Sequence, residues 1–226
     1  MKYNEKGSTM KKEKDNYQGA CIDFETNGLT PDDDSLSMSV RLLNPDGAPT
    51  DVEFYSLIHT DQELDPAALF LNNLTEEEIR KAPPASQVVD NFKLWYQKYC
   101  KTLLSPIGHN FISFDEPRLE DLFTGEYGNY FHYHSDDTMI IARALRRAGF
   151  LKVDSCSLDT LSDYLKIENP NPHHASGDTW TTGMIYSILL KILSPNLLTR
   201  FVRVFNPNYL GISFKKINNF HVKTTL

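Results

Sequence analysis

Two carboxylic acids lie one residue apart inside the first apolar segment of the chain. Residues 21–29 read Cys-Ile-Asp-Phe-Glu-Thr-Asn-Gly-Leu, with the acids at Asp23 and Glu25. Side chains alternate between the two faces of a strand, so both carboxylates point to one face, about 6–7 Å apart. Buried like charges repel each other unless a cation lies between them. The spacing predicts a cation site. The alternative is an exposed strand face on which both acids are solvated.

A second acidic position follows a predicted short strand in the middle of the chain. Residues 107–119 read Ile-Gly-His-Asn-Phe-Ile-Ser-Phe-Asp-Glu-Pro-Arg-Leu, so the strand ends in a His109–Asn110 loop and Asp115 starts a helix. A carboxylate at that place can also cap the helix and is favoured by the helix dipole. Metal binding and helix capping both remain open for Asp115.

A third acid, Asp178, opens the last strongly helical segment. It follows a proline-rich loop, Asn-Pro-Asn-Pro-His-His, at residues 169–174. Asp178 could cap its helix, and the two histidines could be ordinary surface residues of the loop. A zinc site is a further alternative, although no cysteine stands at a zinc-ligand spacing. It would use the four histidines His132, His134, His173 and His174.

These positions need alternating elements to bring them together. Three apolar segments joined by short turns predict an antiparallel meander at 19–24, 35–47 and 50–59. Helical and strand-like patterns then alternate. The predicted helices cover 73–83, 86–100, 114–123, 136–149, 157–167 and 178–193, and the predicted short strands cover 105–110 and 130–134. This order predicts an α/β fold with a mixed central sheet flanked by helices.

Composition and charge limit the function classes. The 226 residues, 40% of them hydrophobic, are enough for one domain with a sizeable core. The sequence has no apolar run of membrane-spanning length, and its first 20 residues lack an apolar block, so we expect no membrane span and no signal peptide. Three scattered cysteines favour a reducing, cytoplasmic setting. They are Cys21, Cys100 and Cys156.

The predicted domain organisation has three parts. Residues 1–17 are expected to be a flexible polar tail, 18–194 the folded domain, and 195–226 a basic extension that packs on or continues that domain. The net charge of the chain is −7, yet the extension contains no acid. A basic surface beside an acidic centre suits a metal-dependent enzyme acting on polyphosphate substrates, and a solvated basic tail is the alternative. The basic residues are Arg200, Arg203, Lys215, Lys216 and Lys223.

Together and in this order, the acidic segments resemble the motifs of DEDD-type 3′–5′ exonucleases of the DnaQ-like family, in the histidine (DEDDh) subclass. The resemblance covers about residues 18–193 and implies a ribonuclease H-like fold, with a five-stranded sheet of three antiparallel strands followed by two parallel ones. One departure is the second strand, Ser-Leu-Ser-Met-Ser-Val-Arg-Leu-Leu at 35–43, which lacks the family's Ile-Gly-Ala pattern. The matched residues are Asp23-Phe24-Glu25-Thr26, His109-Asn110, Phe114-Asp115, Asp137-Thr138, and His173, Ala175 and Asp178.

The resemblance implies a metal centre of four carboxylates. Asp23 would bridge two ions, Glu25 would bind one, and Asp115 and Asp178 would complete the cage. Hard carboxylate oxygens suit Mg²⁺ or Mn²⁺. Two such ions activate a water molecule and stabilise the leaving 3′ oxygen in phosphodiester hydrolysis.

The resemblance also implies a general base and substrate contacts. His173 would take the proton from the attacking water. His174 competes for this role, but its spacing to Asp178 is one residue short of the family pattern. Contacts to the terminal nucleotide would come from Thr26, Leu29, His109 and Asn110.

The implied function is a metal-dependent 3′–5′ exonuclease that releases nucleoside 5′-monophosphates from single-stranded or frayed DNA. Its partner would be a nucleic acid with a free 3′ end. One alternative is an exoribonuclease of the same family that trims RNA or oligoribonucleotides, because metal ligands do not read the 2′-hydroxyl. Another is a catalytically silent module that binds nucleic acid or protein. The presence of all four acids and the histidine argues against that module.

Overall fold

The computed structural model describes residues 17–194, so the predicted extension and all but the last residue of the predicted tail lie outside the described residues. The strands are β1 (Gln18–Thr26), β2 (Ser35–Leu43), β3 (Pro49–Leu57), β4 (Leu104–Gly108) and β5 (Asp136–Asp137). The helices are α1 (Pro66–Leu71), α2 (Glu76–Lys81), α3 (Ala85–Tyr99), α4 (Asp115–Leu122), α5 (Tyr127–Tyr130), α6 (Thr138–Arg147), α7 (Leu158–Leu165) and α8 (Ala175–Leu193), with a 3₁₀ helix η1 (Phe111–Ser113).

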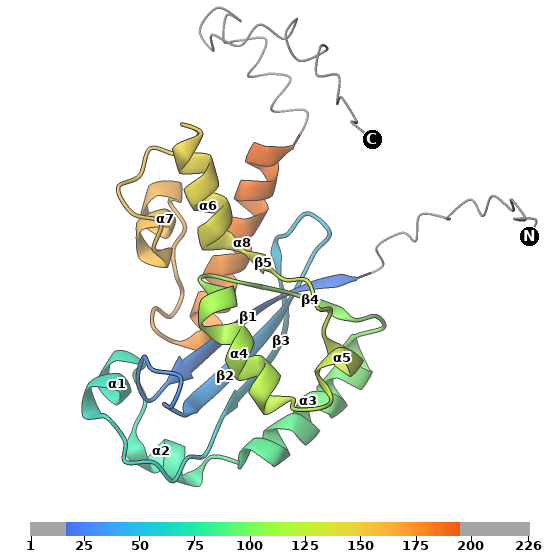
Figure 1. The fold of residues 1–226 in the computed structure, drawn as a ribbon, viewed down its shortest axis with the longest axis vertical. Coiled ribbons are helices and arrows are strands. Elements are labelled where there is room, and N and C mark those ends of the chain that lie inside the picture. The colour runs from blue at the N-terminus through green and yellow to red at the C-terminus, as the bar shows by residue number, and fades with distance from the viewer. Residues whose placement is uncertain (1–16, 195–226) are drawn as a thin grey trace, which may run out of the picture.

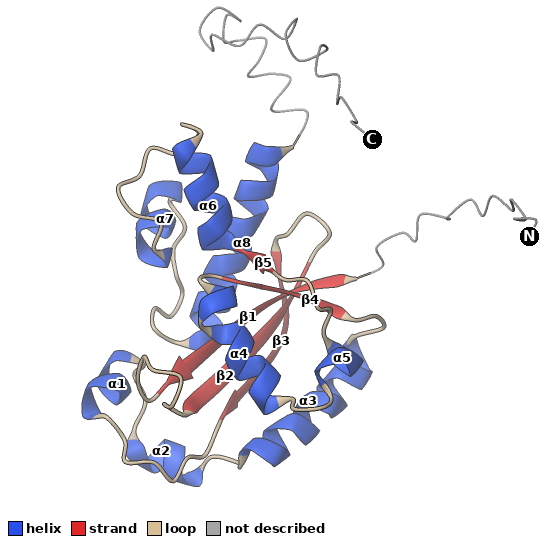
Figure 2. Cartoon of the chain, in the orientation of Figure 1, coloured by secondary structure: helices blue, strands red, loops and turns tan. Residues whose placement is uncertain are grey.

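The strands form one five-stranded sheet in the order β3-β2-β1-β4-β5 (Figures 1 and 2). The pairs β1–β2 and β2–β3 are antiparallel, and the pairs β1–β4 and β4–β5 are parallel. The predicted mixed sheet is therefore confirmed.

The predicted strand at 130–134 is wrong, because the fifth strand consists of residues 136–137. Residues 127–130 form α5, and Phe131 makes a single bridge to Leu104. The Phe131 side chain is buried in the aromatic core around Phe92. Tyr130 and Phe131 pack in this core, whereas Tyr133 is 76% exposed, so the start of the segment is buried without regular strand pairing.

The predicted helices are present, and their boundaries differ by at most a few residues. The capping box at Thr75 and Glu78 forms as expected, with hydrogen bonds in both directions. Helix α8 begins at Ala175, three residues before the predicted start. Helix α1 was not predicted, because it is only 6 residues long and its signals are one capping aspartate, Asp65, and one proline.

The two faces of the sheet have different partners. On one face, apolar side chains including Ile22, Phe24 and Val40 pack with α3, α4 and the aromatic cluster. Helix α8 covers β1, β2 and β3 on the other face. Gly183 allows close approach there, because a Cβ at that position would lie 3.0 Å from Leu43 Cδ2. Helices α6 and α7 pack against α8 in a second apolar cluster.

The face toward α8 explains the unusual sequence of β2. Strand pairing places Ser37 opposite Glu25, Ser39 opposite Asp23 and Arg41 opposite Cys21. These β2 residues therefore share the face of the two acids. All three are buried, and two of them bond to α8, because Ser39 pairs with Thr179 and Arg41 with Ser176.

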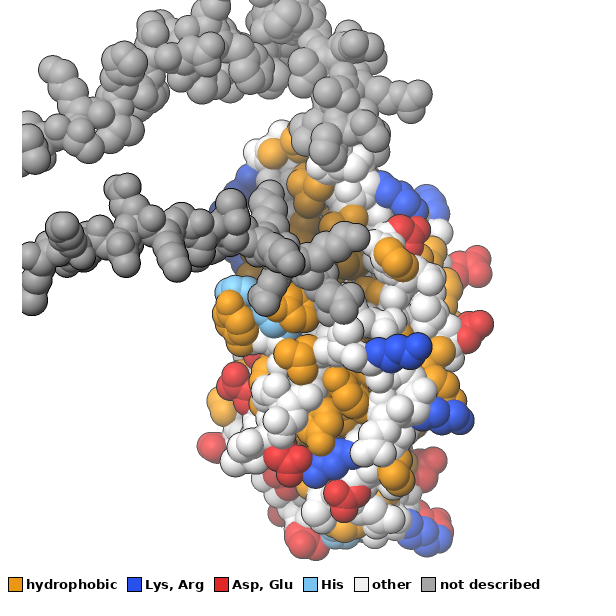
Figure 3. Space-filling model, turned by 90° about the vertical axis from the view of Figure 1, so that its right-hand side faces the viewer, with side chains coloured by type: hydrophobic (Ala, Val, Ile, Leu, Met, Phe, Trp, Pro, Cys, Tyr) orange, Lys and Arg blue, Asp and Glu red, His pale blue; other side chains and the backbone are white. Residues whose placement is uncertain are grey.

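The surface over α3 and α5 has no concentration of one charge. In Figure 3, basic and acidic side chains of the described residues are interspersed on this side of the molecule. No helix within residues 17–194 is long and apolar enough to cross a membrane. All three cysteines are buried free thiols.

Candidate active site

Three acids from two elements converge at the end of β1. Asp23 and Glu25 project from β1 toward α8, and Asp178 lies in the first turn of that helix. One carboxylate oxygen from each lies within 4.8 Å of the others. Within residues 17–194 this is the only group of three or more histidine, cysteine or acid side chains with metal-ligand geometry, so the four histidines considered for zinc form no such group.

Asp115 stands beside this cluster and does not cap its own helix. The N-cap position of α4 is Phe114, and no side chain caps that end. Instead, Asp115 Oδ1 accepts the backbone N–H of Phe24 at 3.0 Å. Strand β4 pairs with β1 only as far as Cys21, so the carboxylate takes an N–H beyond the end of that pairing. This bond fixes a buried acid next to Asp23.

Asp178 is also not the cap of its helix, because the cap is His174. Asp178 Oδ1 accepts a hydrogen bond of 2.6 Å from the Asn169 side chain. The loop lies tightly against the helix at Gly177, where a Cβ would be 2.1 Å from the carbonyl oxygen of Asn171. Asn169 was missed in the sequence, since a single loop amide nine residues before an acid has no periodic signal.

Burial and mutual repulsion make these acids hard to ionise. Burial is the main cause that raises the pKa of Asp23 well above its usual range, and neighbouring acids add to the effect. Burial likewise raises the pKa of Glu25 to about 7, that of Asp115 to about 8 and that of Asp178 to about 6. The hydrogen bond from Phe24 partly offsets the increase in the pKa of Asp115, and the one from Asn169 partly offsets that of Asp178.

The residues fit a divalent cation. Glu25 Oε1 is buried and has no hydrogen-bond partner among the described residues. A buried carboxylate oxygen without a partner is costly, and a cation would satisfy it. All the converging donors are carboxylate oxygens, which favour Mg²⁺ or Mn²⁺ over softer metals.

The two adjacent histidines have different environments. His174 Nδ1 accepts the N–H of Ser176 at 3.3 Å, and its ring stacks on Tyr55 with centroids 4.7 Å apart. Burial lowers the pKa of His174. His173 is exposed, with a left-handed φ of 56°, and its charge lowers the pKa of Asp178. His174 therefore holds the helix start, while His173 is open to a reacting group near Asp178.

The residues predicted to touch substrate fall into two groups. Leu29 is 86% exposed at the loop after β1, and Thr26 is buried with its hydroxyl donating to the Gly28 carbonyl. His109 Nδ1 lies 2.9 Å from Thr138 Oγ1, and the Asn110 N–H donates to the Asp137 carboxylate. Leu29 is therefore the exposed member, and the other three have partners inside the protein. Asn110 also adopts a left-handed φ of 64°, which asparagine tolerates.

An exposed aromatic side chain on α1 was missed in the sequence. The loop after β1 is tied to the segment around α1, because Asn72 donates to the Thr26 carbonyl and Asn27 donates to the Glu63 carbonyl. Phe70 on α1 is 88% exposed. The sequence did not reveal this position, because α1 is only 6 residues long and was not recognised as a helix.

Comparisons with known proteins identify the fold. No protein-family model and no curated protein matches this sequence. E. coli exonuclease I bound to a dT13 oligonucleotide matches with a TM-score of 0.65 at 18% identity, over 86% of this chain and 45% of that one. The zinc-bound form of the E. coli exonuclease I–single-stranded DNA complex matches at 0.64 and 19%, over 81% and 42%.

Cell-death related nuclease 4 matches with a TM-score of 0.62 at 12% identity, over 77% of this chain and 64% of that one. The chain spans less than half the length of the exonuclease I structures. These similarities confirm the predicted fold, which this chain shares with solved exonucleases.

Proposed function

We propose that residues 18–194 are the catalytic domain of a metal-dependent 3′–5′ exonuclease that releases nucleoside 5′-monophosphates from DNA. The observation that carries this proposal is the convergence of Asp23, Glu25 and Asp178, with carboxylate oxygens within 4.8 Å, beside the buried Asp115. The choice of DNA is supported by neighbours of the same fold that were solved with DNA oligonucleotides.

The four acids would hold two divalent ions. Such ions lower the pKa of a bound water and stabilise the leaving 3′ oxygen. The protein contributes the geometry before substrate arrives, because Asp115 is fixed by Phe24 and Asp178 by Asn169. Carboxylate ligands that are already held in place need little reorganisation during the reaction.

His173 would accept the proton of the attacking water on an imidazole nitrogen. Its exposure and its electrostatic effect on Asp178 support this role, and the structural bonds of His174 argue against the neighbouring ring. We expect His173→Ala to lower kcat by about 10²–10⁴-fold without changing thermal stability. His174→Ala should mainly lower the Tm, since it removes a helix cap.

Leu29 and Phe70 would form the apolar contact for the terminal base. They lie on two segments that are hydrogen-bonded to each other beside the acid cluster. Base–aromatic stacking contributes about 1–3 kcal/mol and tolerates any base, which suits an enzyme that degrades from an end.

The test is digestion of one labelled oligonucleotide in four forms: DNA and RNA, each with a free or a blocked 3′ end. We expect Mn²⁺-dependent release of 5′-monophosphates from unblocked DNA, and none with Asp23→Asn. Preferential cleavage of RNA would transfer the proposal to the exoribonuclease alternative. Binding without cleavage would support the silent module.

A further inference from the structure

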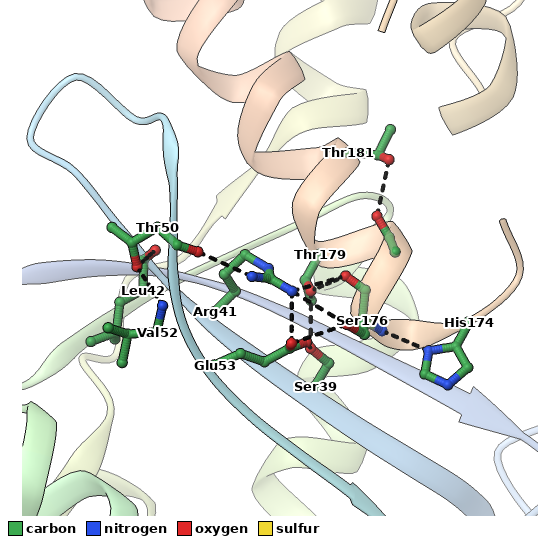
Figure 4. Close-up of polar contacts among 11 residues, drawn as sticks. Ser39, Arg41, Leu42, Thr50, Val52, Glu53, His174, Ser176, Thr179 and Thr181 are labelled. Carbon is green, nitrogen blue, oxygen red and sulfur yellow. Dashed lines mark hydrogen bonds and ion pairs between the residues drawn. The ribbon is translucent and has the colours of Figure 1, made fainter. Parts of the chain in front are cut away.

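A buried polar cluster links the sheet to the helix that carries Asp178. It joins β2, β3 and the first turn of α8 (Figure 4). We call it the clamp, and its members are Ser39, Arg41, Glu53, Ser176 and Thr179.

An ion pair lies at the centre of the clamp. Arg41 Nη2 is 2.7 Å from Glu53 Oε2, and the two side chains are 9% and 19% exposed. Arg41 also donates to the Thr50 carbonyl at 3.0 Å and to the Ser176 carbonyl at 3.3 Å. Glu53 accepts from Ser39 at 2.7 Å and from Ser176 at 3.0 Å. The pair therefore bonds to both strands and to the helix.

Strand pairing places the clamp next to the acids. Ser39 lies opposite Asp23, and Arg41 lies one side-chain row further along the same face, opposite Glu53. The clamp is therefore a direct neighbour of the acid cluster on the face toward α8, while Arg41 itself is too buried to reach substrate.

The clamp holds the helix turn on both sides of Asp178. Ser176 bonds to Arg41 and Glu53, and Thr179 Oγ1 lies 2.9 Å from Ser39 Oγ. Thr179 also donates to the Ser176 carbonyl at 3.0 Å. Asp178 lies between these two residues in sequence, so a shift of this turn would move its carboxylate.

Stability alone is a weak reason for this arrangement. A buried ion pair costs desolvation, and an apolar replacement is often equally stable or more stable. Its hydrogen bonds, however, are directional. The acids repel one another and tend to separate α8 from β1 when no cation is bound. The directional hydrogen bonds of the clamp lie beside the acids and oppose that separation.

We propose that the Arg41–Glu53 pair is a positioning device that holds Asp178 against Asp23 and Glu25 in readiness for metal. This inference rests on the proposed metal site. Neither residue of the pair touches substrate or metal. Both act through Ser176 and the turn that contains Asp178.

The test compares Mn²⁺ affinity and thermal stability in the full chain. The variants are Arg41→Met, Glu53→Gln and the double variant, with Thr181→Val as the matched control. Thr181 is buried on the next turn of α8, and its hydroxyl donates to Gly177 within the same helix. Mn²⁺ binding is followed by the loss of the free-ion signal in electron paramagnetic resonance.

We expect Arg41→Met to weaken Mn²⁺ binding about 10–100-fold, the range found for residues that orient metal ligands. Each single variant should also lower the Tm by on the order of 10 °C, since it leaves one buried charge unpaired. The double variant should regain most of the Tm but not the Mn²⁺ affinity. Thr181→Val should keep wild-type affinity.

Recovery of both properties in the double variant would show that the pair only balances charge, and would overturn the proposal. If a single variant does not fold, Ser176→Ala provides the same comparison, because it removes one hydroxyl and leaves the ion pair intact. Unchanged affinity in Ser176→Ala and in the double variant would also overturn it. A wild-type chain that binds no Mn²⁺ would instead refute the proposed function on which this inference rests.

Discussion

The substitution Glu25→Gln should stabilise the metal-free protein while removing a metal ligand. Glu25 Oε1 is buried without a partner, and burial followed by the charge of Asp178 raises its pKa from 4.5 to about 7. At about 1.4 kcal/mol per tenfold change in proton affinity, ionising Glu25 in the folded state costs roughly 3 kcal/mol above pH 7. A neutral glutamine avoids this cost but needs hydrogen-bond partners of its own, so we expect a gain of about 1–3 kcal/mol.

The effect has a defined pH dependence. A carboxyl whose folded pKa is raised destabilises the protein progressively as the pH rises from its unfolded value of 4.5 to the folded value of about 7. The advantage of Glu25→Gln should therefore be largest at pH 8 and fall below about 1 kcal/mol at pH 5. For a domain of this size, the gain at pH 8 corresponds to a rise in Tm of about 3–10 °C.

The assay is thermal unfolding by circular dichroism at pH 8 and pH 5, in EDTA and in saturating Mn²⁺. Mn²⁺ should reverse the order of stability, because it binds the folded wild type more tightly than the variant. Glu53→Gln is the matched control, since Glu53 is paired with Arg41 and its loss should destabilise the protein in all conditions. A lower Tm for Glu25→Gln in EDTA at pH 8, or an equal gain with Mn²⁺ present, would refute the reasoning.

Three further predictions concern activity. EDTA should abolish hydrolysis and Mg²⁺ or Mn²⁺ should restore it, and full activity in EDTA would rule out the metal site. Leu29→Ser should raise KM about fivefold, from roughly 1 kcal/mol of lost apolar contact, with no change in Tm; an unchanged KM would remove Leu29 from the substrate site. Gly177→Ala should lower kcat at least tenfold in steady-state assays, because the added Cβ would lie 2.1 Å from the Asn171 carbonyl and displace the loop that holds Asp178. Wild-type kcat in that variant would show that the loop does not position the acid.

The sequence was sufficient to predict most of the fold. Alternating apolar residues around Asp23 and Glu25 identified a strand with two faces, and the capping box at Thr75 marked the start of α2. These signals are local, so they do not depend on the rest of the molecule. The segment at 130–134 was misassigned because Tyr130 and Phe131 pack in the aromatic core, and a short apolar run can be buried without belonging to a strand.

The candidate acids could be selected from the sequence, but their partners could not. Capping by Asp115 remained open until the structure showed its bond to Phe24, 91 residues away, and its role as a metal ligand stays a prediction. Asn169 and the Arg41–Glu53 pair were missed for the same reason, since their contacts join elements distant in sequence. Ser39 looked like part of a departure from the pattern of the family that the sequence resembles, and its bond to Thr179 on α8 explains it.

The most direct test of the proposed metal site is the anomalous scattering of manganese from a crystal of this protein soaked in Mn²⁺. We predict two peaks about 3.5–4 Å apart between β1, α4 and the first turn of α8, with Asp23 in contact with both. Absence of any peak among these four acids at saturating Mn²⁺ would contradict the account.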